Sequence, residues 1–145
     1  MIKKLIDANL ILRYLLRDDE ILFRTAASLL EKVKLGEEAV IIPESVLAET
    51  VYVLQKVYKI EKEIIAEKIR ALFAYKGVVN SDKKDLVDSI ILFGQSHLSI
   101  VDCIVCSKSI NQGFTLLTFD DDLKSTFSKK LKSFEKAQKQ LINKQ

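Results

Sequence analysis

Short apolar runs alternate along this chain with longer segments of helical periodicity. An alternation of this kind is typical of βαβ units, in which helices connect parallel strands. We therefore expect an α/β fold with a mostly parallel sheet. Strands are predicted at 4–7, 39–42, 78–79 and 114–117, and helices at 9–16, 19–34, 43–58, 61–75, 82–95, 99–112 and from 120 onward.

Signals for helix ends support these boundaries. Asp19 and Ser99 are residue types that favour N-terminal caps. Pro43 suits the first turn of a helix, where its missing N–H costs nothing. Gly36 and Gly113 follow helical segments at positions where glycine commonly ends a helix.

The chain has 145 residues, of which 48% are hydrophobic and 30% are charged. This length is typical of one domain that buries about 70% of its unfolded surface. We expect no signal peptide, because Asp7 interrupts the first apolar run. No uncharged apolar stretch approaches the ~20 residues of a membrane span. A cytoplasmic protein with no membrane partner is expected.

Two cysteines form a Cys-x-x-Cys motif at Cys103 and Cys106. A redox pair or half of a zinc site would use such spacing. A complete zinc site needs further ligands, and the only histidine is His97. The cysteines lie on a mostly apolar helical face, which favours packing in the core.

The net charge of +3 is unevenly distributed. Residues 123–145 carry seven lysines and one acid, Glu135, whereas residues 1–122 have a net charge of −3. A basic tail on an acidic body suits a phosphate-bearing polymer held near a metal site. A solvated terminal helix that keeps the protein soluble is the alternative, and both interpretations stay open. We divide the chain into a domain at 1–128 and a basic helical extension at 129–145.

Four acidic residues lie within or directly after apolar runs. They are Asp7, Glu49, Asp102 and Asp120. Burial of an ionised carboxylate costs several kcal/mol or more unless a cation or strong donors compensate. The four lack obvious basic neighbours, so we expect one hard divalent cation bound by oxygen ligands.

The predicted scaffold allows these acids to converge. Asp7 and Asp120 follow the carboxyl ends of predicted strands, where ligands bind in open parallel sheets. Glu49 shares a helical stripe with Val46 and Val53, which predicts that it faces inward. Asp102 falls in the first turn of its helix.

Structural roles are the alternative for some of these acids. Asp7, Asp102 and Asp120 could each serve the N-terminus of a helix as a cap or a dipole partner. Glu49 is in mid-helix and caps nothing. Two short polar residues, Asn9 and Thr118, could orient the carboxylates of Asp7 and Asp120. Weaker acidic candidates are Asp88, Asp121 and Asp122.

Four motifs in this order resemble the PIN-domain ribonucleases, especially the VapC-type toxins of toxin–antitoxin pairs. They run through 6–19, 42–54, 100–103 and 117–120. The resemblance covers most of residues 4–123, and the lysine-rich extension is longer than expected of the compact toxins. It implies a three-layer α/β/α sandwich and a homodimer.

The resemblance also implies a chemistry. Asp7, Glu49, Asp102 and Asp120 would bind Mg²⁺ or Mn²⁺, and the metal would activate a water that hydrolyses an RNA phosphodiester. The implied partners are RNA and a small antitoxin that blocks the acidic site. Residues expected to contact RNA phosphates are Arg13, Arg17, Lys124, Lys129 and Lys130.

Rival functions remain at this point. A phosphatase with an Asp nucleophile would have a second acid two residues after the first, where this chain has Asn9. A phospho-receiver domain would have paired acids after the first strand and a lysine after the last strand, and neither is present. A PIN-fold nuclease of RNA processing outside a toxin system, or an inactive RNA- or protein-binding module, is the remaining alternative.

Overall fold

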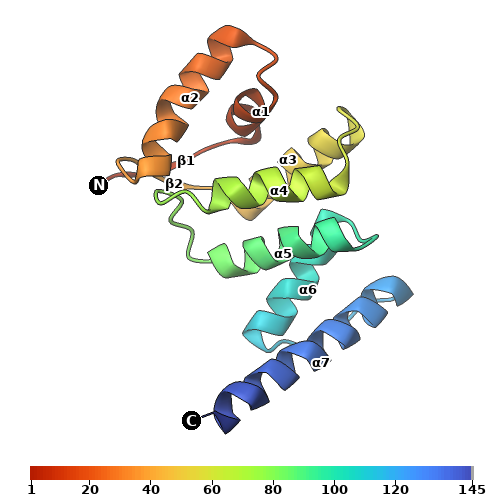
Figure 1. Cartoon of the computed structure of the whole chain (residues 1–145). Coiled ribbons are helices and arrows are strands. Elements are labelled where there is room, and N and C mark those ends of the chain that lie inside the picture. The colour runs from red at the N-terminus through yellow and green to blue at the C-terminus, as the bar shows by residue number, and fades with distance from the viewer. Residues whose placement is uncertain (145) are drawn as a thin grey trace.

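The computed structural model describes residues 1–144 and confirms the α/β class. Helices lie on both sides of a small parallel sheet, with α1 and α2 on one side and α4 and α5 on the other (Figure 1). No helix within the described residues is long and apolar enough to cross a membrane. The elements are β1 (Lys3–Leu5), α1 (Ala8–Leu16), α2 (Glu20–Leu35), β2 (Ala39–Ile41), α3 (Glu44–Lys56), α4 (Lys62–Phe73), α5 (Lys83–Gln95), α6 (Ile100–Gln112) and α7 (Asp121–Asn143).

The sheet consists of β1 and β2, which pair in parallel with Lys3 opposite Ala39. A parallel bridge between Val40 and Val78 adds the beginning of a third strand. The buried side chain of Asn80 continues this pairing, since its amide accepts from the N–H of Ile42 at 2.9 Å and donates to the carbonyl of Ile42 at 2.7 Å. The sheet therefore has β2 at its centre and β1 at a free edge.

The predicted helix ends are largely confirmed. The side chains of Asp19 and Ser99 accept hydrogen bonds from N–H groups in the first turns of α2 and α6. Gly36 and Gly113 end α2 and α6 with φ of 81° and 73°, in the left-handed region that glycine adopts without strain. Pro43 is the residue before α3 rather than its first residue.

The core lies between the sheet and the surrounding helices. Its largest fully buried side chains include Phe73 and Phe93. Both cysteines are free and buried, as the sequence predicts. Burial raises the pKa of the Cys103 thiol to about 11.

One predicted strand is absent, because residues 114–120 form no regular structure. Phe114, Leu117 and Phe119 are exposed, and no backbone hydrogen bond joins 115–119 to another described residue. The segment leads from α6 into α7, and α7 packs against α6. A strand needs a paired neighbour, and this packing holds the segment away from the free edge of β1.

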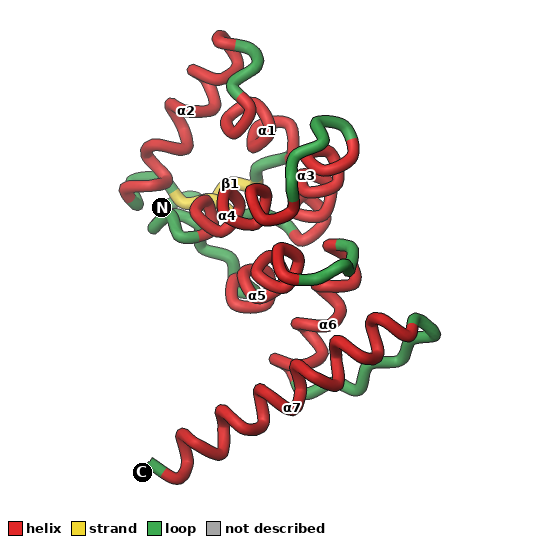
Figure 2. The backbone as a smooth tube through the Cα atoms, turned by 45° about the vertical axis from the view of Figure 1, so that its right-hand side comes forward, coloured by secondary structure: helices red, strands yellow, loops and turns green. Residues whose placement is uncertain are grey.

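Helix α7 extends away from the rest of the molecule (Figure 2). Its first half is anchored, since Leu123 is buried and Phe127 and Phe134 pack against the core. Its last turns are uncovered, and Leu141 and Ile142 are exposed. The predicted division at residue 128 falls inside this continuous helix and stays a prediction.

Candidate active site

Asp7 connects β1 to α1. It is the N-terminal cap of α1, and its Oδ1 accepts from the N–H of Leu10 at 2.9 Å. The capping interpretation of this residue is therefore confirmed. The side chain is exposed, so the expectation that Asp7 is buried is wrong. An exposed carboxylate keeps one oxygen available to a ligand while the other caps the helix.

Glu49 is exposed on α3, and the expectation that it faces inward is wrong. The buried stripe of α3 consists of Leu47, Thr50, Val51 and Leu54. At about 100° per residue, Glu49 lies roughly opposite the middle of that stripe. Its true neighbours on the helix surface, Val46 and Val53, are only half-buried.

Asp102 is half-buried in the first turn of α6, where its N–H donates to the Ser99 hydroxyl at 3.2 Å. The preceding turn is fixed by Lys62, whose Nζ donates to the carbonyls of Ser96 and Leu98 at 2.7 and 2.8 Å. Burial of this ammonium lowers the pKa of Lys62. Asp102 is therefore held at a defined position.

Helix α3 joins the regions that carry these three acids. It packs against both α1 and α6. An ion pair between Lys108 of α6 and Glu44 of α3 connects the two helices. This ion pair raises the pKa of Lys108. Asp7, Glu49 and Asp102 thus lie on neighbouring parts of the fold.

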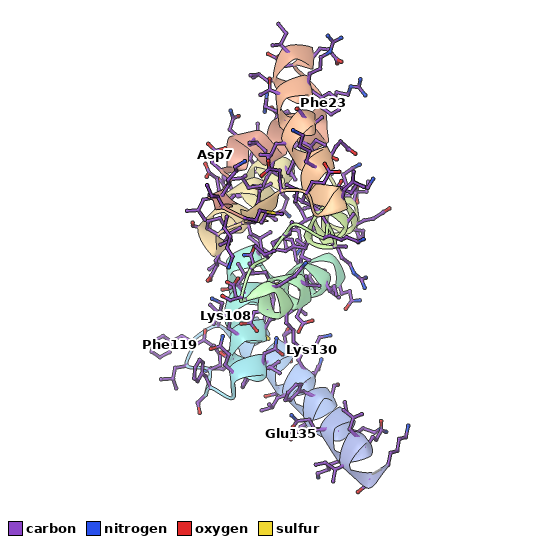
Figure 3. All side chains as sticks on the ribbon, turned by 90° about the vertical axis from the view of Figure 1, so that its left-hand side faces the viewer. Asp7, Phe23, Lys108, Phe119, Lys130 and Glu135 are labelled. Atoms are coloured by element: carbon purple, nitrogen blue, oxygen red, sulfur yellow. The ribbon has the colours of Figure 1, made fainter. Side chains whose placement is uncertain are left out.

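Asp120 lies elsewhere. It is the N-terminal cap of α7, with Oδ1 accepting from the N–H of Leu123 at 2.9 Å. Figure 3 shows the adjacent Phe119 near Lys108, beside the part of the molecule that carries α7 and well separated from Asp7. Convergence of all four acids is therefore not seen, because Asp120 follows the segment that did not form a strand. Throughout residues 1–144, no group of three or more His, Cys, Asp or Glu side chains is close enough to hold a metal ion.

Asn9 and Thr118, which are predicted to orient the carboxylates of Asp7 and Asp120, differ in their contacts. Thr118 does contact Asp120, since its hydroxyl accepts from the Asp120 N–H at 3.0 Å. This bond reaches the backbone of Asp120, and the carboxylate is not its partner. Asn9 is exposed, and its side chain makes no hydrogen bond to a described residue. The role of both residues toward a metal stays a prediction.

Several acids elsewhere in the molecule are paired with cations, and the four candidates are not. Arg13 binds Asp18 at 2.7 Å, Lys4 binds Glu38 at 2.9 Å and Lys84 binds Asp88 at 2.8 Å. Within the part of the chain that the structure describes, no ion pair includes Asp7, Glu49, Asp102 or Asp120. Their charges are free to attract a cation from solution.

The acid that the fold does bury is Asp85 of α5, which was not among the candidates from the sequence. Its side chain accepts from the amides of Asn111 and Gln112 at 2.9 and 2.8 Å. The residue is only 7% exposed, and these bonds tie α5 to the end of α6. Neither amide stands out in the sequence, so no local signal identified this network.

Among the predicted RNA contacts, the two arginines are already engaged. Arg13 binds Asp18 and the hydroxyl of Tyr58, and Arg17 binds Glu20 and covers the ring of Phe23 at 4.2 Å. The lysines of α7 are different, since Lys124, Lys129 and Lys130 are exposed and unpaired within residues 1–144. The basic helix is the better-placed surface for phosphates.

Comparison with known families gives one match, to the PIN domain, over residues 4–127. The chain belongs to the PIN-domain family. Neither the curated proteins nor the solved structures gave a match. PIN domains are generally nucleases, commonly of RNA, and they typically use divalent metals.

The donor chemistry of this PIN domain fits such a metal. Four carboxylates without cationic partners supply the hard oxygen ligands that Mg²⁺ and Mn²⁺ prefer. The arrangement is incomplete, because Asp120 lies with α7 and because Asp7, Glu49 and Asp102 do not form a group that could hold a metal within residues 1–144. A metal site formed by all four acids of one chain requires residues 114–120 to change position.

Proposed function

We propose that this PIN domain is a metal-dependent endoribonuclease whose site contains Asp7, Glu49, Asp102 and Asp120. The proposal rests most directly on membership of the PIN-domain family, with the four carboxylates in the motifs that resemble its ribonucleases. None of the four forms an ion pair among the described residues, so each is available to a cation. Uncompensated negative charge at neighbouring elements is unfavourable unless a cation binds there.

The residues of the chain have separate tasks in this hypothesis. Asp7, Asp102 and Asp120 would hold Mg²⁺ or Mn²⁺, and Glu49 would bind the metal or orient the attacking water. The bound metal would lower the pKa of that water and neutralise charge on the phosphorus. The α7 lysines would hold the RNA backbone through its phosphates.

Within this function, we propose the role of a toxin of the VapC type, active as a homodimer and inhibited by a small antitoxin. The motifs around Asp7 and Glu49 support this assignment by their resemblance to those toxins. A nuclease of RNA processing is the alternative within the same chemistry. A neighbouring short gene for a DNA-binding protein would favour the toxin, and an isolated gene would favour RNA processing.

Replacement of Asp7 by Asn tests the nuclease function against a matched control. Asp7 and Asp19 each cap a helix through one carboxylate oxygen, at 2.9 and 3.0 Å from the capped N–H. Asn is nearly as good a cap as Asp, so both variants should fold. Asp7→Asn should lower cleavage of a fluorescent RNA in Mn²⁺ by 100-fold or more, on the order of the loss of about 3 kcal/mol of transition-state stabilisation. Asp19→Asn should retain wild-type cleavage.

Two results would contradict the proposal. Full activity in Asp7→Asn would remove this residue from the site. A wild-type protein that binds RNA without metal and does not cleave it would instead favour the non-catalytic binding module. The position of Asp120, far from Asp7, supports this rival.

A further inference from the structure

The chain has two exposed surfaces that are complementary, a free strand edge and an extended apolar segment. One is the free edge of β1, where all three residues are exposed and the adjacent Ile2 is exposed as well. The other is the extended segment 114–120, in which Leu117 is 89% exposed and Phe119 is fully exposed. A strand edge with unpaired backbone groups is a template for pairing, and an apolar extended segment is the strand that would pair.

We propose that residues 114–120 of one copy add as a parallel strand to β1 of a second copy, in a reciprocal exchange. The structure favours a second copy over the same chain as the acceptor. Burial of Leu123 and packing of Phe127 hold α7 against α6, and Figure 3 shows Phe119 well separated from Asp7, which follows β1 in the same chain. Pairing within one chain would break this contact, whereas pairing between two chains preserves it.

Reciprocal pairing is closed and symmetric. Each copy donates one segment and accepts one, which gives a two-fold dimer in which both β1 edges are paired. The exposed Phe114, Leu117, Phe119 and Leu5 of both copies would be covered together. With roughly 150–250 Å² for each buried phenylalanine, the exchange buries on the order of 1,000 Å². This reaches the area of about 1,000 Å² that a specific interface requires.

Parallel pairing also adds Asp120 to the proposed active site, and this part rests on the proposed function. The carboxyl end of the added strand then lies beside the carboxyl end of β1, where ligands bind in parallel sheets. Asp120 of one copy joins Asp7 of the other. In the register that sets Asp120 opposite Asp7, Leu117 lies opposite Lys4. The site would contain residues of both chains.

Cysteine cross-linking tests the exchange without reference to activity. Lys4→Cys and Leu117→Cys are placed in separate chains that carry different mass tags, and the two are mixed and oxidised. Both native cysteines are fully buried and should not react. We expect a disulfide-linked heterodimer. The control pair is Leu117→Cys with Ile21→Cys, an equally exposed residue of α2, and it should give no heterodimer.

The double variant Lys4→Cys/Leu117→Cys in one chain distinguishes the two possible acceptors. Exchange predicts linked dimers. A monomer with an internal disulfide would overturn the proposal, because the segment would then pair with its own β1. Absence of any link in both the mixed and the double variants would overturn it as well.

Complementation connects the exchange to the active site. Asp7→Asn and Asp120→Asn chains should each be inactive. After mixing by refolding, half of the dimers are mixed, and each mixed dimer has one intact site, so about a quarter of wild-type activity should return. Cross-linking without wild-type nuclease activity would reject the function and keep the exchange. Wild-type activity without complementation would reject the exchange.

Discussion

One aspartate can cap a helix with one carboxylate oxygen and bind a metal ion with the other. Asp7 and Asp120 each use a single oxygen on a backbone N–H, and the second oxygen of each carboxylate makes no hydrogen bond to residues 1–144. The sequence identified these positions by their apolar surroundings, but exposure of Asp7 and Glu49 shows that burial was the wrong reason. The four acids share the lack of a cationic partner among the described residues, which is a property of the folded chain.

The buried thiol of Cys103 gives a prediction at the residue scale. Burial raises its pKa from the usual value of about 9 to about 11, so the folded chain holds this proton more tightly than the unfolded chain does. Its contribution to stability is therefore present below pH 9 and is lost as the pH rises toward 11. The free energy of unfolding should fall by roughly 2 to 3 kcal/mol over this range.

Urea denaturation of the wild-type protein and of Cys103→Ala between pH 8 and 11 measures this effect. The variant will be less stable overall because it leaves a cavity, but the difference between the two proteins should shrink as the pH rises. A difference that stays constant across the range would contradict the assignment of the raised pKa to Cys103.

Close approach of α4 and α5 gives a prediction at the element scale. A Cβ atom on Gly94 would lie 2.8 Å from the Cβ of Ala66, closer than side chains tolerate. Gly94→Ala should therefore destabilise the protein by about 1 to 3 kcal/mol through overpacking. The double variant Gly94→Ala/Ala66→Gly removes the clash and should recover part of this loss. An additive loss in the double variant, measured by thermal unfolding, would show that the two helices do not meet here.

Local sequence signals predicted the helices well, but they predicted the pairing of distant segments less well. The caps at Asp19 and Ser99 and the glycines at the ends of α2 and α6 are decided within one turn of helix, so the sequence contains them. The strand at 114–117 depends on a distant partner, and its residues remain extended without one. The bond between Asn80 and Ile42 escaped prediction for the same reason, since it joins residues 38 positions apart.

At the scale of the whole molecule, charge is separated along the structure. The candidate acids Asp7, Glu49 and Asp102 lie on the body, and the unpaired lysines follow the projecting α7. Such a separation suits a polyanion that is bound at one place and cut at another. It also explains why the arginines near α1 are unsuited to phosphates, because their charges are already paired.

Neutralising the lysines of α7 should flatten the salt dependence of RNA binding. The triple variant Lys129→Gln/Lys132→Gln/Lys136→Gln changes exposed residues only. The slope of log affinity against log salt for single-stranded RNA should fall by up to about 2, at about 0.7 for each lost phosphate contact. The control is Lys56→Gln/Lys59→Gln/Lys68→Gln, which makes the same change of charge at exposed positions elsewhere. Equal slopes for the two variants would exclude a specific role of α7.

Binding of Mn²⁺ is the most direct test of the account. The thermal unfolding midpoint of the wild-type protein should rise with Mn²⁺ concentration, with stabilisation near 2.7 kcal/mol at 100 times the dissociation constant. Asp102→Asn should abolish this rise, whereas Asp88→Asn, which removes an acid already paired with Lys84, should leave it unchanged. A wild-type midpoint that does not respond to Mn²⁺, or an equal response in Asp102→Asn, would contradict the claim that these carboxylates share one cation.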